Sequence, residues 1–176
     1  HWCDMAEFIT GQRITRVAAR TLRAFETRDG SPVTTEDAVS VTFETDGGAL
    51  GSMIASQVSR GRKNRLWISV DGEHEAVGFD QEAAEQLWVG RADESAVIMR
   101  GATPNDPDVD RYNHVPAGHP QGYQECFNDF VADMYASIAG EVPDGMPTFR
   151  DGLRAAVVTD AVMTAAATQE WVEVPR

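Results

Sequence analysis

The stretch that decides the fold is residues 39–58, Val-Ser-Val-Thr-Phe-Glu-Thr-Asp-Gly-Gly-Ala-Leu-Gly-Ser-Met-Ile-Ala-Ser-Gln-Val. Val39, Val41 and Phe43 alternate with polar side chains, and this period of two predicts a strand with one buried face. Residues 46–48, Asp-Gly-Gly, supply the positive φ angles of a tight turn. The chain then returns as a second strand, which carries small side chains on both faces. The stretch therefore predicts an antiparallel hairpin.

Similar patterns lie on both sides of this hairpin. Residues 14–25 are rich in β-branched and aliphatic side chains, and Asp71-Gly72 marks a second hairpin turn. The remaining strand candidates are residues 66–70, 75–79, 86–89 and 96–99. No helical pattern separates consecutive strands. The sequence therefore predicts an antiparallel meander and not a parallel sheet with crossover helices.

The first ten residues predict a helix. Met5, Phe8 and Ile9 recur at helical spacing, and Gly11 follows as a typical helix end. The pattern predicts that these three side chains pack against the rest of the domain. By this pattern alone, His1 is only an exposed residue at the helix start.

Two further helices close the chain after an irregular segment. Residues 101–120 are rich in Pro, Asn, Asp and Gly, and a loop of this length inside a domain is usually functional or disordered. Residues 123–138 carry a wide apolar stripe, which is typical of a core. Thr148 with Asp151 three residues later predicts the start of the last helix. Residues 171–174 predict a short final strand.

Charge and cysteine content exclude several classes of function. A formal net charge of −13 would repel a phosphate backbone or an anionic membrane, so neither is expected as a partner. No apolar run is long enough to span a bilayer, and no secretory leader is visible. Cys3 and Cys126 are too few for a disulfide scaffold. They indicate free thiols in a reducing cytoplasm.

The sequence contains no signature of a nucleotide or metal site. A dinucleotide fingerprint requires G-x-G-x-x-G between a strand and a helix, whereas Gly47, Gly48 and Gly51 lie within the hairpin. No pair of Cys or His residues has the spacing of a zinc site. We therefore expect this chain alone to bind no cofactor and no metal.

Several blocks of the sequence resemble those of one family. The chain opens with His1-x-x-Asp4, followed by Thr-Gly and a long strand. The later blocks are Ser-Arg-Gly-Arg-Lys-Asn-Arg-Leu at 59–66, Leu-Trp-Val-Gly at 87–90, Pro-Ala-Gly-His-Pro-Gln-Gly-Tyr at 116–123, Pro-Thr-Phe-Arg-Asp-Gly-Leu-Arg-Ala-Ala at 147–156 and Trp-Val-Glu-Val at 171–174. Their order and spacing are similar to those of the C-terminal domain of the glucose–fructose oxidoreductase/inositol dehydrogenase (Gfo/Idh/MocA) family.

The resemblance implies an α+β fold. It implies a large, mostly antiparallel open sheet with helices packed on one face and the other face available for subunit pairing. Residues 1–176 would form a single substrate-binding and oligomerisation domain, and the Rossmann domain that binds NAD or NADP in the parent would be absent. We expect a homo-oligomer, a dimer or tetramer, because Trp67 and Trp88 would otherwise lie on an uncovered apolar sheet face.

The resemblance also implies an activity for the full-length parent. It would be an NAD(P)-dependent oxidoreductase that moves a hydride between the nicotinamide and a secondary alcohol of a sugar or cyclitol. The isolated chain is expected to be inactive. The alternative is a non-catalytic sugar-binding or assembly domain of the same fold, and the residues that precede His1 would distinguish the two.

Five residues are candidates for the site. His1 aligns with the family's catalytic histidine, and a helix N-terminus favours the neutral imidazole that can accept a proton. His119 and Tyr123 are candidates for binding sugar hydroxyls. Alternatively, His119 caps the next helix and Tyr123 belongs to its apolar stripe. Lys63 and Asn64 are further candidates within a basic stretch that is more often a solvated loop or a subunit edge.

Overall fold

The computed structural model describes residues 1–101 and 107–176 and divides them into two compact units. The first unit comprises residues 1–61 and 147–176, and the second comprises residues 62–146. Each unit is described by itself. The expected irregular segment 101–120 includes residues 102–106, which lie outside the described residues. In the part that is described, every helix is too short or too polar to cross a membrane.

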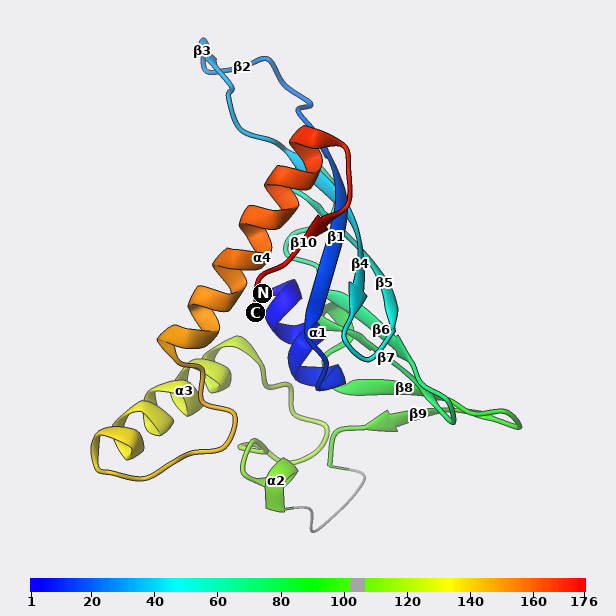
Figure 1. Ribbon diagram of the computed structural model, residues 1–176. Helices are drawn as coiled ribbons and strands as arrows, with labels where there is room; N and C mark the ends of the chain where they lie inside the picture. The colour runs from blue at the N-terminus through cyan, green and yellow to red at the C-terminus, as the bar shows by residue number, and fades with distance from the viewer. Residues whose placement is uncertain (102–106) are drawn as a thin grey trace. The chain divides into compact units, whose positions relative to one another are not determined.

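The first unit contains a four-stranded antiparallel sheet with the strand order β10-β1-β4-β5 (Figure 1). The strands are β1 (Ile14–Leu22), β4 (Ala38–Thr45), β5 (Leu50–Ser56) and β10 (Val172–Glu173). β4 and β5 form the expected hairpin, with Val41 paired to Met53. A two-stranded ribbon of β2 (Thr27–Arg28) and β3 (Ser31–Pro32) is inserted between β1 and β4.

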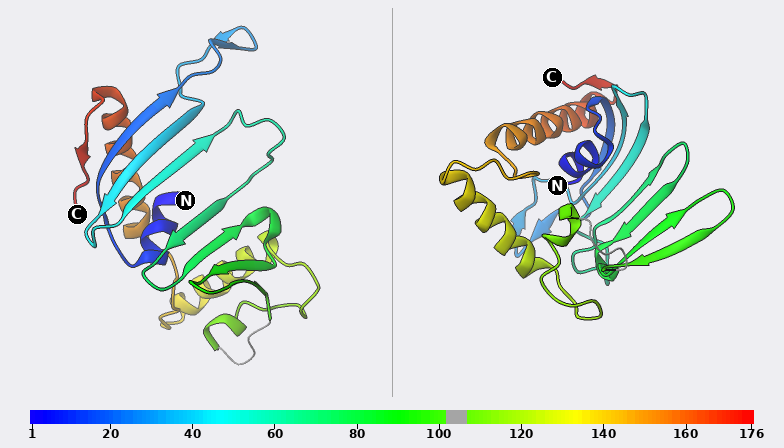
Figure 2. Two further views of the ribbon diagram at one scale, coloured as in Figure 1. Left: turned by 90° about the vertical axis from the view of Figure 1, so that its right-hand side faces the viewer. Right: turned by 90° about the horizontal axis from the view of Figure 1, so that it is seen from below.

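Helices α1 (Trp2–Thr10) and α4 (Phe149–Thr168) lie on one face of this sheet (Figure 2). Their contact with the sheet forms the core of the unit, in which Val17, Val41 and Val158 are fully buried. Side chains alternate along a strand, so Leu50 and Ile54 point to the other face, where both are exposed. The prediction that helices cover one face of an antiparallel sheet is confirmed for this unit.

Helix α1 packs a different face from the one that its apolar pattern predicts. Phe8 is 75% exposed and Ile9 is also exposed, whereas Cys3 and Glu7 are buried. The prediction that Met5, Phe8 and Ile9 form the packed face is therefore wrong for Phe8 and Ile9, whereas Met5 is partly buried. The physical reason is an ion pair. Burial of the glutamate is tolerated here because arginines compensate its charge, and hydrophobic periodicity does not report such compensation.

The second unit contains another four-stranded antiparallel sheet, with the order β6-β7-β8-β9. Its elements are β6 (Trp67–Asp71), β7 (Ala76–Asp80), the 3₁₀ helix η1 (Gln81–Ala83), β8 (Gln86–Gly90), β9 (Ser95–Met99), α2 (Pro107–Asp110) and α3 (Tyr123–Ile138). The α+β class with antiparallel sheets is thereby confirmed. The described strands are divided between two four-stranded sheets and the ribbon. A single domain over residues 1–176 stays a prediction.

The two faces of the second sheet differ in chemistry. Val89 is buried on one face. Trp67, Trp88 and Val97 are exposed on the other, at 58%, 42% and 56%. The indole of Trp88 lies over Gly90, where an added Cβ would meet the ring at 2.4 Å. Glycine at this position therefore leaves the space that the ring occupies.

The apolar stripe of α3 is exposed within the second unit. Tyr123 is 80% exposed, Ile138 is 75% exposed, and α3 has no buried side chain among the described residues. The expectation that the stripe belongs to a core is wrong for this unit taken by itself. Periodicity identifies a surface that can be covered, and it does not say which neighbour covers it.

The burial of the two cysteines predicts different thiol reactivity. Cys3 is 4% exposed, and burial raises the pKa of its thiol, whereas Cys126 is exposed. At pH 8 we expect an aromatic disulfide reagent to modify Cys126 on the order of 100-fold faster than Cys3, because the thiolate is the reactive form. Cys126→Ser should remove the fast phase. A fast phase that persists in this variant would contradict the burial of Cys3.

Candidate functional site

His1 precedes α1 as its N-cap residue and is exposed. Its carbonyl accepts a hydrogen bond from Met5 N at 2.9 Å, so the residue is continuous with the first helical turn. Trp2 packs against Phe43 with ring centroids 5.6 Å apart, and Cys3 lies in the core. The imidazole therefore stands at the exposed end of a helix whose first turn is fixed to the sheet.

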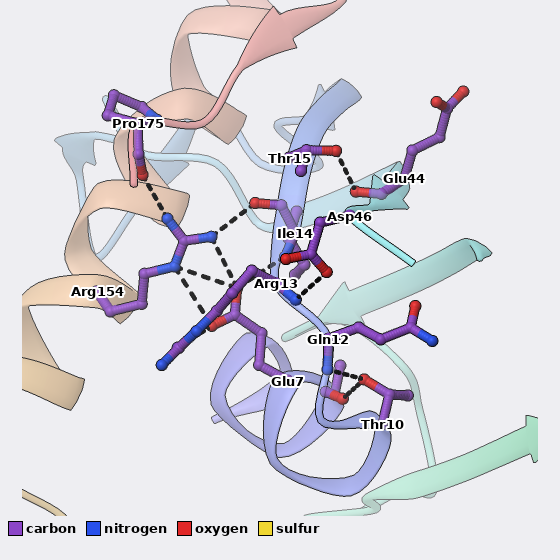
Figure 3. Close-up of polar contacts among 11 residues, drawn as sticks. Glu7, Thr10, Gln12, Arg13, Ile14, Thr15, Glu44, Asp46, Arg154 and Pro175 are labelled. Carbon is purple, nitrogen blue, oxygen red and sulfur yellow. Dashed lines mark hydrogen bonds and ion pairs between the residues drawn. The ribbon is translucent and has the colours of Figure 1, made fainter. Parts of the chain in front are cut away.

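Glu7 occupies the centre of a buried polar cluster on the same helix (Figure 3). Its Oε1 accepts hydrogen bonds from Ile14 N at 2.9 Å and from Arg154 Nη2 at 2.8 Å. Its Oε2 accepts from Arg13 Nη1 at 2.6 Å. The carboxylate thus connects α1 to the start of β1 and to α4.

Opposing effects act on the pKa of Glu7. Burial alone would raise it, but hydrogen bonds from Arg154, from the Ile14 amide and from Arg13 hold the pKa below its ordinary value of 4.5. Because folding lowers this pKa, ionised Glu7 stabilises the fold above that value. The contribution is lost as the pH falls through the folded-state pKa.

In the second unit, Arg100 holds the segment that carries His119. The Arg100 guanidinium donates to Glu85 Oε2 at 2.8 Å, to Asn113 Oδ1 at 3.2 Å and to the carbonyl of Val115 at 3.0 Å. A fourth hydrogen bond goes to the carbonyl of His119 at 2.6 Å. One side chain at the end of β9 therefore fixes several points of the loop.

Gln121 completes this attachment. Its amide N donates to Glu85 Oε1 at 3.1 Å, and its side chain donates to the carbonyl of Tyr112 at 2.7 Å. The hydrogen bond from Gln121 N, together with that from Arg100, lowers the pKa of Glu85. The loop is therefore tied to the sheet by a carboxylate that stays ionised.

His119 does not cap α3, whereas Tyr123 does lie on the apolar stripe of that helix, which is exposed. The N-cap of α3 is Gly122, whose amide N donates to Glu125 Oε2 at 2.8 Å, so Glu125 and not His119 closes the helix start. Tyr123 is exposed and its ring lies 4.9 Å from that of Phe127. Both side chains of the candidate pair are thus exposed on one short segment. Their binding role stays a prediction.

Lys63 and Asn64 lie in an exposed loop before β6. The Asn64 carbonyl accepts from Gln81 Nε2 at 2.9 Å. Two neighbouring arginines form ion pairs with acids of the same unit, Arg62 with Glu82 and Arg65 with Asp80. The basic stretch is therefore partly neutralised, which favours a structural loop over an anion site.

The structure brings some of the predicted residues together. His119 and Tyr123 share one segment, and Lys63 and Asn64 share another, both in the second unit; His1 belongs to the first unit. Among residues 1–101 and 107–176, no group of three His, Cys, Asp or Glu residues could hold a metal ion. A shallow hollow of about 450 Å³ lies between η1 and the loop, lined in part by Met99, Pro120 and Gln121.

Sequence reasoning missed the residues that hold these segments in place, which are Glu7, Arg154, Glu85 and Arg100. One signal was available for the second pair. Gln86 is paired with Met99 in the antiparallel ladder of β8 and β9. The next pair along this ladder is therefore Glu85 opposite Arg100. The first pair joins residues 147 positions apart, and no local pattern links them.

Comparisons with known proteins give consistent matches. Residues 1–77 match the model of the GFO/IDH/MocA C-terminal domain. A levoglucosan dehydrogenase of Pseudarthrobacter phenanthrenivorans is 30% identical over 165 residues, which make up 90% of this chain and 41% of that protein. An oxidoreductase domain protein from Kribbella flavida is 33% identical, with a TM-score of 0.87 over 100% of this chain and 48% of that one.

A levoglucosan dehydrogenase structure in complex with NADH and levoglucosan is also similar. It is 26% identical with a TM-score of 0.86, and the match covers 99% of this chain and 48% of that one. The chain therefore spans about half the length of the structures that it matches, and less of the curated relative. These matches confirm the resemblance that the sequence blocks indicate, which is to the C-terminal domain of the Gfo/Idh/MocA family.

Proposed function

We propose that this chain is the substrate-binding and oligomerisation part of an NAD(P)-dependent oxidoreductase that acts on a secondary alcohol of a sugar or cyclitol. The observation that carries the proposal is the similarity, over 99% of the chain, to a levoglucosan dehydrogenase that binds NADH and levoglucosan. The free cysteines support a cytoplasmic location.

The described residues do not themselves fit a dinucleotide. Both four-stranded sheets are antiparallel. A dinucleotide cradle needs a parallel strand–helix–strand unit with a glycine-rich turn. The nicotinamide of the parent would therefore be held by residues outside this chain, and the preference for NAD or NADP would be set there. The part left to this chain is to bind hydroxyls and to accept a proton.

We assign to His1 the role of accepting the hydroxyl proton of the substrate. An alcohol loses its hydroxyl proton as it is oxidised, and a neutral imidazole within hydrogen-bond reach can accept that proton. His1 is exposed at the N-terminus of α1, which leaves its imidazole accessible to a ligand. His119 and Tyr123 would donate to or accept from other hydroxyls, with Lys63 and Asn64 as weaker contributors.

Substitution of His1 tests the catalytic assignment. In the full-length parent, with levoglucosan and NAD⁺ as probes, His1→Ala should lower kcat by about 10²–10⁴-fold, because general-base catalysis contributes about this factor. His74→Ala is the matched control, since His74 is an exposed histidine in the β6–β7 turn. A near-normal kcat for His1→Ala would remove the proton-accepting role and favour a non-catalytic sugar-binding or assembly domain.

Substitution in the loop tests substrate binding separately. Tyr123→Phe and His119→Ala should each raise KM for the sugar by about fivefold, because one net hydrogen bond is worth about 1 kcal/mol. The kcat should change little. Tyr135→Phe is the control, because Tyr135 is an exposed tyrosine on the same helix. An unchanged KM in both variants would exclude this segment from the sugar site.

Oligomerisation is the third part of the proposal. The exposed tryptophans Trp67 and Trp88 support pairing through this face of the second sheet, since monomers rarely expose large contiguous apolar patches. In sedimentation velocity, the chain should form a dimer or tetramer, and Trp88→Glu should shift it towards monomer. Val142→Glu, an exposed loop position, is the control. A monomer at all concentrations would contradict the proposal.

A further inference from the structure

The carboxylate of Glu7 is buried to an unusual degree for a charged side chain. Its side chain is 6% exposed and that of its partner Arg154 is 14% exposed. Removing two charges from water costs free energy that their attraction does not always recover, so a buried ion pair by itself is weak evidence for stability. The best-attested use of such a pair is to fix one arrangement of the elements that it joins.

The pair joins four segments of the first unit (Figure 3). Glu7 belongs to α1 and Arg154 to α4. Arg154 Nη2 donates to the carbonyl of Ile14 at 2.6 Å, and Nη1 donates to the carbonyl of Pro175 near the chain end. Arg13, just before β1, adds a second charge on Glu7.

At Ile14, the side chains of Glu7 and Arg154 take the place of a neighbouring strand on the β10 side of β1. Its N–H donates to Glu7 and its carbonyl accepts from Arg154. The register of β1 against β4 shifts between Ile14 and Arg16, and β10 pairs only with Arg16 and Val17. The pair therefore satisfies backbone groups at the point where regular sheet pairing is interrupted.

Helix α1 contributes few side chains to the hydrophobic core of the first unit. The helix has nine residues, and Phe8 and Ile9 are exposed. Its apolar anchors, Trp2 and Cys3, both lie in the first turn. Glu7 therefore fixes the other end of the helix. His1 lies six residues earlier, about 9 Å away along the axis at 1.5 Å per residue.

We infer that the buried Glu7–Arg154 pair is a positioning device that sets the orientation of α1 and thereby the place of the His1 imidazole. The inference rests on the proposed role of His1. Neither Glu7 nor Arg154 touches the substrate in this scheme. A displacement of about 1 Å in a reacting group can cost on the order of 100-fold in rate, so loss of the pair slows the step in which His1 takes the proton.

The test uses three variants of the full-length parent, with levoglucosan and NAD⁺ as probes: Glu7→Gln, Arg154→Met and the double variant. Each is compared by urea unfolding and by kcat per folded enzyme. Glu44→Gln is the matched control, because Arg16 of β1 and Glu44 of β4 form a two-bond pair that is partly exposed. Its kcat should be unchanged.

The two readouts separate positioning from stability. Arg154→Met leaves the buried charge of Glu7 with Arg13 as its charged partner, so this variant should have the lowest free energy of unfolding of the three. The double variant should recover part of that stability, because no buried carboxylate remains. All three should show a kcat lowered by about 10–100-fold with little change in KM. The kinetic isotope effect of carbinol-deuterated levoglucosan should rise as the chemical step becomes rate-limiting.

Two results would overturn the inference. One is a kcat that recovers in step with stability in the double variant, which would make the pair merely structural. The other is a normal kcat in every variant while His1→Ala remains impaired. A normal kcat for His1→Ala itself would instead remove the proposed function, so the two failures are distinguishable.

Discussion

The buried carboxylate of Glu7 is the constraint on which the first unit depends. An ionised group in a low-dielectric interior carries a penalty of several kcal/mol unless its partners are in place. Those partners are the Ile14 N–H of β1, the Arg154 side chain of α4 and the side chain of Arg13, the residue just before β1. Arg154 also binds the carbonyl of Pro175, so the same interaction draws the two chain ends to one region. Removal of a single partner of such a pair typically costs about 3–5 kcal/mol, which is a large share of the stability of a small domain.

Much of the fold could be predicted because it is encoded locally. The alternation over residues 39–45 and the Asp-Gly-Gly turn predict β4, β5 and their connection, and Thr148 with Asp151 predicts the start of α4, where the Thr148 N–H and hydroxyl both donate to Asp151. The packed face of α1 could not be predicted in this way. Periodicity assigns Glu7 to solvent, and its actual environment depends on an arginine that lies far away in sequence. Local patterns identify elements, whereas compensated charges are decided by tertiary structure.

The candidate site shows the same division. The position of His1 at a helix start and the irregular character of the loop before α3 were visible in the sequence. The choice between a capping and a free role for His119 was not, because Gly122 and Glu125 can form the cap only in a particular backbone conformation. Arg100 is a long side chain that reaches three carbonyl or amide oxygens at once. No spacing rule predicts such a set, because the loop must first fold around it.

The contact of the Trp88 indole with Gly90 has a consequence for how the surface of this sheet can change in sequence. The indole lies against the sheet only while position 90 has no Cβ, since that atom would meet the ring at 2.4 Å. A single methyl group there would force the ring to move, and the shape of this sheet face would change. The shape of this surface is therefore set in part by the single residue at position 90, through the space that it leaves for Trp88.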